Sequence, residues 1–489
     1  MRDDVSPLMK ASFDYAGQVL TAYAKFVQAS SLSRQERSIG TESSMTTEPQ
    51  SFRHRFVSLY QSAVDEVVRS THGLVGLASR PGLDHDLIHV ATQVAELKAT
   101  GTAELPERPP AKADETAWTF AKMSFELMEA RACGDTAKER RIRNDFRFNV
   151  CDPRWIRTIE SYAKYFGPHG TGAAIPYVRA AQVGPRTVPL KPGATVALIA
   201  DWGTGTDIAV SLLEELALKK PDVVIHLGDI YYSGTSEECD VNFKRIIDTI
   251  LERATQHIPV YTLAGNHDMY SGGAGYYGLL ATLNCEACRQ PASFFCLRNE
   301  HWQFIAMDTG LHDYDPLTVD DVVTFLEKDE EDWIVDRIAE FKGKTILLSH
   351  HPLFSAFSRI GPAGEDGVLC AHNPMLARSF ERFRQAAKQP IAAWFWGHEH
   401  NLYVYESYLG LERGRCIGHG AVPVFTSAST YLPHPGISSP PALARVQLDA
   451  NDKIYMHGFT IIKLAENESA SVEYYEDNDA TNPIFMETI

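Results

Sequence analysis

The sequence predicts an α/β fold with two mixed sheets and outer helices, preceded by an all-α N-terminal region. From Ala194 onward, short apolar strands alternate with helical segments, as in layered α/β proteins. Residues 1–185 instead place apolar residues at helical spacing. The length of 489 residues exceeds one ordinary core. We therefore expect a helical domain or cap at residues 1–185 and a second domain at residues 194–489.

The N-terminal region is expected to contain five helices. In the first, apolar residues recur three or four positions apart, at Met9, Phe13, Ala16, Leu20, Tyr23 and Val27. Residues 31–51 are rich in Ser, Thr, Glu and Gln and predict an exposed linker. Similar stripes predict helices near residues 56–67, 87–97, 118–132 and 156–166. We interpret the stripes as packing surfaces of a bundle; the alternative is amphipathic contact with a membrane.

The second domain shows strands and helices in alternation. The predicted elements are crossover helices at 207–219 and 241–253, two strands within 294–308 around a turn at 298–300, and strands of a second sheet at 444–448, 458–464 and 471–475. Short strands separated by amphipathic helices bury both faces of a sheet. Two mixed sheets with helices on their outer faces are the expected architecture.

Five buried strands of this domain end in residues of the kinds that bind metals. The clearest is the run 223–227, after which Gly228 allows a sharp turn and Asp229 projects from the sheet edge. Alone, such an aspartate is equally consistent with a helix cap. The recurrence favours a metal site, because the five strand ends together supply Asp201, Asp229, Asn266, His350, His398 and His400. Carboxylate and imidazole ligands suit iron, zinc or manganese.

The number of candidate ligands indicates two metal ions rather than one. A carboxylate can bridge two ions, so a dinuclear site with Asp229 between them is the economical arrangement. Paired metals about 3.5–4 Å apart are a recurrent solution for in-line attack at phosphorus.

Composition and charge restrict the partners. A formal net charge of −17 disfavours nucleic acid and anionic lipid, which leaves a phosphorylated small molecule or a phosphoprotein as substrate. No apolar run is long enough for a membrane span. The N-terminus, Met1 to Ser6, carries two acids and does not resemble a Sec signal, so a cytoplasmic location with reduced cysteines is expected. Export by a route that uses no such signal is the alternative. The pair Cys285 and Cys288 is interpreted as two ordinary thiols.

The motifs resemble those of calcineurin-like metallophosphoesterases, and more narrowly the purple acid phosphatase branch. The quoted motifs are Asp201-Trp202-Gly203, Gly228-Asp229-Ile230-Tyr231-Tyr232, Gly265-Asn266-His267-Asp268, Leu347-Leu348-Ser349-His350 and Gly397-His398-Glu399-His400. The superfamily usually has Asp-x-His in the first motif, but here the third residue is Gly203. In purple acid phosphatases a tyrosine three residues after the bridging aspartate supplies the missing ligand, and Tyr232 stands at that offset. The resemblance covers roughly residues 194–475 and implies a four-layer αββα sandwich.

The resemblance also implies a ligand for each ion. The Fe(III) ligands would be Asp201, Asp229, Tyr232 and His400, and the ligands of a divalent Fe(II), Zn(II) or Mn(II) ion would be Asp229, Asn266, His350 and His398. The implied activity is acid-phosphatase-like hydrolysis of phosphate monoesters by a metal-activated hydroxide.

Residues beside the ligands have further expected roles. By analogy, His267 would contact a phosphate oxygen or protonate the leaving group, and Asp268 would orient its imidazole. His351 should face away from its neighbour on the strand, which favours packing or support of a ligand. Arg359 stands roughly where mammalian-type relatives have a substrate-facing histidine; it is either a bidentate phosphate clamp or a solvated surface arginine.

Two alternative functions remain open at this stage. One is a phosphodiesterase or nucleotide pyrophosphatase on the same metal framework, because one framework supports several phosphoester reactions. The other is a partner-binding regulator in which the metal centre is vestigial and the helical region carries the function.

Overall fold

A computed structural model provides the structure of the chain. It describes residues 93–94, 97–98, 105–106, 115–146, 155–167, 170–251, 257–316, 322–362, 369–424, 426, 430–432, 437–451, 454–466, 468–477 and 481–489. The chain forms two compact units, residues 1–156 and residues 157–489. Residues 157–185, which the sequence groups with the N-terminal region, thus lie in the second unit.

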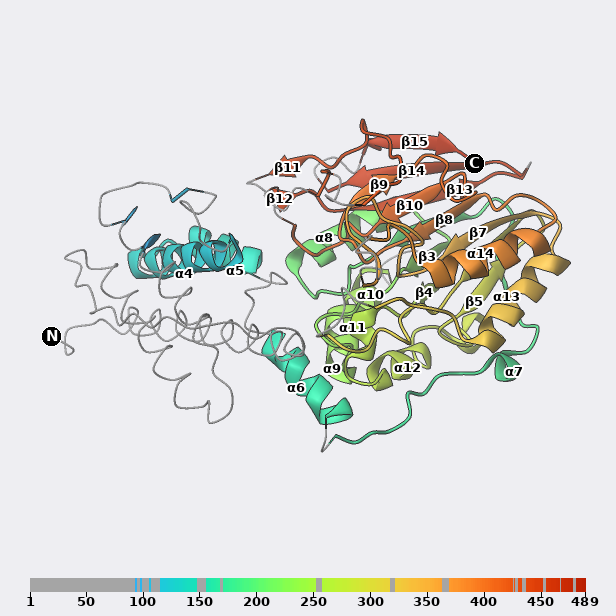
Figure 1. Cartoon of the computed structure of the whole chain (residues 1–489), viewed down its shortest axis with the longest axis horizontal. Coiled ribbons are helices and arrows are strands. Elements are labelled where there is room, and N and C mark those ends of the chain that lie inside the picture. The colour runs from blue at the N-terminus through green and yellow to red at the C-terminus, as the bar shows by residue number, and fades with distance from the viewer. Residues whose placement is uncertain are drawn as a thin grey trace. The chain divides into compact units, whose positions relative to one another are not determined.

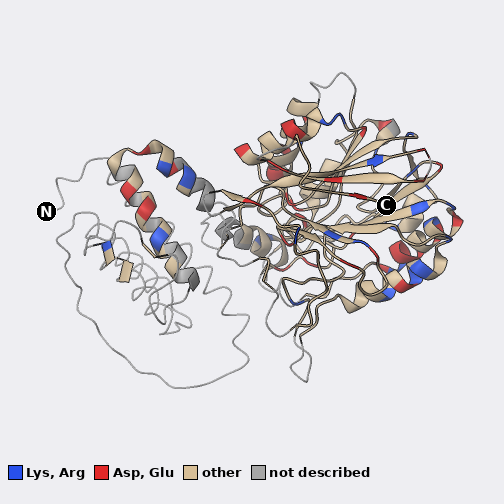
Figure 2. Ribbon diagram, turned by 90° about the horizontal axis from the view of Figure 1, so that it is seen from above, with Lys and Arg blue, Asp and Glu red and all other residues tan. Residues whose placement is uncertain are grey.

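The described part of the first unit is helical. Its longest elements are α4 (Glu115–Cys133) and α5 (Thr136–Phe146), along which acidic and basic residues are interspersed (Figure 2). Within α4, Trp118, Ala121 and Phe125 are buried, as the predicted stripe requires. The expected helices at 9–27 and 56–67, most of the one at 87–97 and the linker at 31–51 lie outside the described residues. The expected helix at 156–166 is present as α6 (Trp155–Phe166), most of which lies in the second unit.

The second unit contains two mixed sheets (Figure 1). One has the strand order β1-β5-β6-β7-β8-β10-β9 and the other β15-β14-β13-β2-β3-β4. The strands are β1 (Val188–Pro189), β2 (Thr195–Ile199), β3 (Val223–His226), β4 (Val260–Thr262), β5 (Phe295–Arg298), β6 (Trp302–Ala306), β7 (Lys344–Leu348), β8 (Ala393–Trp396), β9 (Leu402–Val404), β10 (Gly414–Ile417), β13 (Gly458–Leu464), β14 (Ala470–Glu476) and β15 (Phe485–Thr488). A separate pair consists of β11 (Ala450–Asn451) and β12 (Ile454–Tyr455). The predicted pair of mixed sheets is confirmed.

The helices of this unit lie mainly on the outer faces of the sheets. They are α7 (Ala180–Val183), α8 (Asp207–Leu218), α9 (Ser236–Glu238), a π-helical segment (Cys239–Lys244), α10 (Arg245–Leu251), α11 (Asn266–Met269), α12 (Ala274–Leu280), a 3₁₀ turn (Glu286–Cys288), α13 (Lys328–Glu340) and α14 (Pro374–Ala386). The predicted crossover helix at 207–219 is α8, and that at 241–253 overlaps the π-helical segment and α10. No described helix is long and apolar enough to cross a membrane.

Side-chain alternation along the strands separates the core into layers. On β2, Val196 and Leu198 pack between the sheets against residues such as Phe304, whereas Ala197 and Ile199 face the layer of α8 and α10. On the far side, α13 and α14 cover the other sheet through a cluster that includes Trp333, Phe380, Phe383 and Trp394. The order of layers is therefore helix, sheet, sheet, helix, as predicted.

One predicted strand is wrong. Residues 444–448 form a turn followed by an extended segment that pairs with no named strand. Val446 and Leu448 are nevertheless buried against the inter-sheet core. Their alternating burial imitates a strand although a loop carries them, so the periodicity alone was misleading.

Candidate metal centre

The candidate ligands lie just beyond the carboxyl ends of strands in both sheets. Asp201, Asp229 and Asn266 follow β2, β3 and β4. These strands run parallel, so their carboxyl ends meet at one edge. His350 and His398 follow the parallel strands β7 and β8 of the other sheet. The packed sheets thus bring together residues that are up to about 200 positions apart in the chain.

One group of ligand atoms surrounds the side chain of Tyr231. Its phenol oxygen lies 2.8 Å from His400 Nε2, 3.1 Å from Asp229 Oδ2 and 3.3 Å from Asp201 Oδ1. His400 Nε2 is itself 3.4 Å from Asp201 Oδ1. Three of these residues, Asp201, Asp229 and His400, present ligand atoms that all lie within 4.8 Å of one another.

A second group contains Asn266, His350 and His398. Asn266 Oδ1 is 3.1 Å from both His350 Nε2 and His398 Nδ1, and these two nitrogens are 3.2 Å apart. His350 Nε2 is 3.4 Å from Asp229 Oδ2. An ion with four bonds of about 2.0–2.1 Å spaces its ligand atoms about 3.3 Å apart, so these donors fit a four-coordinate ion. The first group has the same spacing and donors of similar chemistry, so it fits a second ion.

Asp229 belongs to both groups through a single oxygen. Its Oδ2 faces Tyr231 on one side and His350 on the other, whereas Oδ1 accepts a hydrogen bond from the His267 backbone N–H at 3.0 Å. This is the bridging position that the sequence predicted for Asp229.

The backbone at the ligands is conformationally unusual. Asp201, Asp229, His398 and His400 have φ angles of 51°, 74°, 70° and 42°, in the left-handed region that non-glycine residues seldom occupy. Such outliers concentrate at functional sites, where the surrounding structure holds them in place. Gly265 must be a glycine for a related reason, because a Cβ there would lie 2.1 Å from Asp229 Oδ1.

Tyr231, rather than Tyr232, provides the phenol at this centre. The sequence assigned Tyr232 as a ligand from its offset of three from Asp229. In the structure Tyr232 contributes its backbone, since its carbonyl accepts a hydrogen bond from His267 Nδ1 at 2.8 Å. Tyr231 is turned inward because Ile230 pairs with Gly203 in a β-bridge and the Tyr231 N–H donates to the Gly203 carbonyl.

The His267 ring faces the candidate centre, whereas Asp268 has different partners from those expected. The His267 ring is buried, and its Nε2 lies 3.8 Å from Asp229 Oδ2, so this nitrogen faces the candidate centre. Asp268 does not orient this imidazole in the structure. Its carboxylate instead accepts hydrogen bonds from the backbone N–H groups of Asp229, Gly265 and Ile230. Asp268 therefore holds together the loops that follow β3 and β4.

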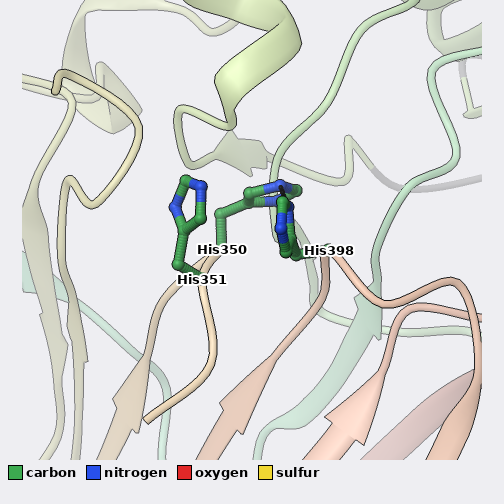
Figure 3. Close-up of side chains that lie close together, drawn as sticks. All are labelled: His350, His351 and His398. Atoms are coloured by element: carbon green, nitrogen blue, oxygen red, sulfur yellow. Dashed lines mark hydrogen bonds between the residues drawn. The ribbon is translucent and has the colours of Figure 1, made fainter. Parts of the chain in front are cut away.

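His351 lies beside the second group, as Figure 3 shows with His350 and His398. Its Nδ1 is 3.1 Å from Thr309 Oγ1 and its Nε2 is 3.1 Å from Asp313 Oδ2. The ring centroid is 4.6 Å from that of His398. The ring therefore lies among the candidate ligands instead of facing away from His350, and one ligand nitrogen from each of His350, His351 and His398 lies within 4.8 Å of the others. Because both ring nitrogens of His351 have protein partners, we interpret it as a support residue.

The structure brings Arg359 into a loop rather than into either ligand group. Its guanidinium donates to the Gly361 carbonyl, and the side chain is half-buried. Two other residues at the centre were missed. Tyr270 accepts a hydrogen bond from Asn266 Nδ2, which directs Asn266 Oδ1 toward the histidines, and Asp313 pairs with His351. The signal for Tyr270 was available, since it follows Asn266 by one helical turn.

The negative charge of Asp229 and the positive charge of His350 stabilise each other. Burial opposes ionisation of Asp229, but His350 and His267 outweigh it and hold its pKa well below the usual value. For His350, burial is again opposed by Asp229, which raises the pKa to about 9. Burial and two nearby histidines, His351 and His350, hold the pKa of His398 well below its usual value. A metal ion would therefore displace a proton from His350.

The comparison with known proteins points to the same family as the sequence motifs. Residues 194–402 match the family model of calcineurin-like phosphoesterases. No curated protein matches the chain.

Among solved structures, three similarities are representative. Purple acid phosphatase PPD1 from yellow lupin (Lupinus luteus) seeds is 16% identical with a TM-score of 0.41, and the match covers 61% of this chain and 55% of that one. GAP50, the anchor in the inner membrane complex of Plasmodium, is 14% identical with a TM-score of 0.41 and coverages of 61% and 89%. PhoD is 11% identical with a TM-score of 0.41 and coverages of 59% and 67%.

The chain thus matches just over half of the length of the lupin enzyme. The family prediction itself rests on the motifs and the family model, and both identify the same part of the chain. Residues 194–402, somewhat less than half of the chain, are thus similar to the calcineurin-like phosphoesterases.

Proposed function

We propose that the protein hydrolyses phosphate monoesters at a dinuclear metal centre of the purple acid phosphatase type. The observation that carries this proposal is the position of Asp229 Oδ2 between two ligand groups, one of which contains a tyrosine phenol. A phenolate is a hard anionic donor that suits Fe(III), and an imidazole-rich group suits Fe(II), Zn(II) or Mn(II).

Each ion would have four protein ligands. Asp201, Asp229, Tyr231 and His400 would hold the ferric ion, and Asp229, Asn266, His350 and His398 would hold the divalent ion. When bound, the pair supplies Lewis-acid chemistry, which neutralises phosphate charge and acidifies water.

The residues around the ligands have separate tasks. His267 donates from Nδ1 to the Tyr232 carbonyl, which fixes the ring so that Nε2 faces the centre. A proton at Nε2 for a phosphate oxygen or the departing alkoxide requires the doubly protonated ring. Burial lowers the pKa of His267, so this role would need acidic pH. Asp268 keeps Asp229 in place through the backbone. Arg359 is proposed as a phosphate clamp, carried by the loop that follows His350.

The substrate class follows from charge. A chain with a net charge of −17 attracts a phosphorylated small molecule or phosphoprotein only where metal ions reverse the local potential. The vestigial-centre alternative predicts a damaged ligand set, whereas each group keeps four candidate ligands, with neighbouring ligand atoms about 3 Å apart. A phosphodiesterase or pyrophosphatase would use the same donors.

The deciding experiment combines metal analysis with a substrate panel. Purified protein reconstituted with iron and zinc should bind two ions per chain and hydrolyse monoesters faster than diesters and pyrophosphates. Faster cleavage of diesters or pyrophosphates would replace the monoester proposal by its alternative. Two bound metals with no hydrolysis anywhere in the panel would favour the regulator.

A further inference from the structure

Helix α6 precedes the region that matches the family model, yet it contacts the loops of the candidate centre. Four of its residues, Thr158, Tyr162, Tyr165 and Phe166, make these contacts. Their spacings of four, three and one place them on one face of the helix. Lys164 is exposed on a different face. The contact residues all lie in the second compact unit.

The first contact joins α6 to the loop after β3. Thr158 Oγ1 accepts a hydrogen bond from Ser233 Oγ at 3.2 Å, and each of these residues is only 1% exposed. Ser233 follows Tyr232, whose carbonyl holds the His267 ring. A buried, satisfied hydrogen bond of this kind fixes the position of the helix relative to the loop.

The second contact joins α6 to the loop after α11. The Tyr165 ring lies directly against Gly272, where a Cβ would be 2.1 Å from ring carbons. Gly272 is two residues beyond Tyr270, which accepts the hydrogen bond from the Asn266 amide. A glycine is required at this position both by the ring and by its φ of +83°.

The third contact joins α6 to the loop after β6. The Phe166 ring stacks on that of Tyr314, with centroids 4.7 Å apart and an interplanar angle of 20°. Burial and the nearby Asp315 carboxylate raise the pKa of the Tyr162 phenol. This loop also carries Asp313, the partner of His351. Tyr314 is 38% exposed, so its aromatic surface remains available.

We propose, building on the proposed phosphoesterase function, that Tyr162, Phe166 and Tyr314 form an aromatic wall at the loop whose Asp313 supports His351, and that this wall selects substrates with a neutral aromatic leaving group. Exposed aromatic surface favours stacking with a planar ring. The Asp315 carboxylate on the same loop repels a leaving group that carries additional negative charge. A phosphorylated phenol or tyrosine fits this chemistry, whereas a polyphosphate does not.

The test uses two non-hydrolysable ligands, so it does not depend on turnover. Phenylphosphonate and methylphosphonate carry the same phosphonate and differ in the ring. Titration calorimetry on the metal-loaded full chain should show phenylphosphonate binding about two- to tenfold more tightly. Phe166→Leu and Tyr314→Leu should each remove most of this ratio without changing the affinity for methylphosphonate. Lys164→Ala, on a different face of α6, should leave both affinities unchanged.

Equal affinities of the wild type for the two phosphonates would overturn the proposal. So would a Tyr314→Leu variant that retains the wild-type ratio; this exposed position decides the question if Phe166→Leu fails to fold. Discrimination without hydrolysis of any ester would refute the proposed function and leave the wall intact. Hydrolysis of monoesters without discrimination would refute the wall alone.

Discussion

The assignment of Tyr231 as the phenol ligand leads to a sharp prediction. Tyr231→Phe keeps a ring that is fully buried 4.3 Å from the His267 ring, but it deletes the oxygen that lies near Asp201, Asp229 and His400. Burial and the two carboxylates raise the pKa of this phenol well above its usual value in the metal-free protein. Its ionisation therefore depends on a bound ferric ion.

The expected loss can be bounded from the geometry. Removing a residue that merely supports a metal ligand costs about 10–100-fold in metal affinity. The Tyr231 oxygen is itself one of four donors in its group, so the loss of iron affinity should reach at least the upper end of that range. The fold should survive, because the deleted hydroxyl contributes about 1–3 kcal/mol as a buried hydrogen-bonding group.

The assay is the visible spectrum of the oxidised, iron-loaded protein together with its iron content. The wild type should be purple from tyrosinate-to-iron charge transfer, and Tyr231→Phe should lose both the band and most of the iron. Tyr232→Phe is the matched control, because it deletes the same hydroxyl from the neighbouring tyrosine while leaving in place the carbonyl that accepts from His267. A band that survives in Tyr231→Phe, or disappears in Tyr232→Phe, would refute the reasoning.

Three further predictions follow from the described contacts. Asp229→Asn should remove at least one metal and nearly all activity, because one oxygen serves both groups; two retained metals with normal turnover would contradict the bridge. Tyr270→Phe should release the Asn266 amide and weaken the divalent ion about 10–100-fold while iron is retained, as metal analysis can check. Burial raises the pKa of Glu476 to about 7 from 4.5, so wild-type stability should fall as pH rises through this interval. Glu476→Gln should reduce that fall by at most about 3 kcal/mol in denaturation curves at low and high pH, while the fall due to other buried carboxyls such as Glu399 remains.

The sequence predicted most of the candidate ligands because the end of a buried strand can be recognised in a sequence as the end of a short apolar run. Asp201, Asp229, Asn266, His350 and the His398 motif each follow a short apolar run, and parallel strands deliver their carboxyl ends to one edge. Once the two sheets pack against each other, these side chains come into contact. Asp229 then lies between the two ligand groups.

The errors arose where a side chain depends on backbone geometry that the sequence does not encode locally. Tyr231 and Tyr232 are adjacent aromatics, and which one faces the metals depends on the left-handed Asp229 and on the bridge from Ile230 to Gly203. Asp268 was expected at an imidazole, but three backbone N–H groups compete for its carboxylate. Motif offsets carry no information about either choice.

The domain boundary is a third case, and it matters for function. Stripes of apolar residues predict helices but not their partners, so α6 was grouped with the N-terminal region. Its contact face is instead used by loops after β3, α11 and β6. A boundary near residue 156 separates α6 from α4 and α5.

Two truncations distinguish these boundaries. Removing residues 1–153 leaves all of α6, so metal content and phosphonate selectivity should stay close to those of the full chain. Removing residues 1–170 also deletes the Thr158–Ser233 hydrogen bond and the Phe166–Tyr314 stack. Together these contacts are worth about 1–3 kcal/mol. The longer truncation should therefore lower the free energy of unfolding, expose the Tyr314 ring and reduce solubility.

The two truncated proteins should differ in their preference for phenylphosphonate but not in metal content. Because the candidate ligands named above all follow the deleted segment, the longer truncation should still bind two metals when it is folded, while its preference for phenylphosphonate disappears. The two proteins thereby separate metal binding from the preference for phenylphosphonate over methylphosphonate. If both truncations behave alike in stability and selectivity, α6 is an appendage of the N-terminal region and its contacts with the three loops carry no function. If only the shorter one retains selectivity, the catalytic unit begins at α6, before the region that the family motifs define.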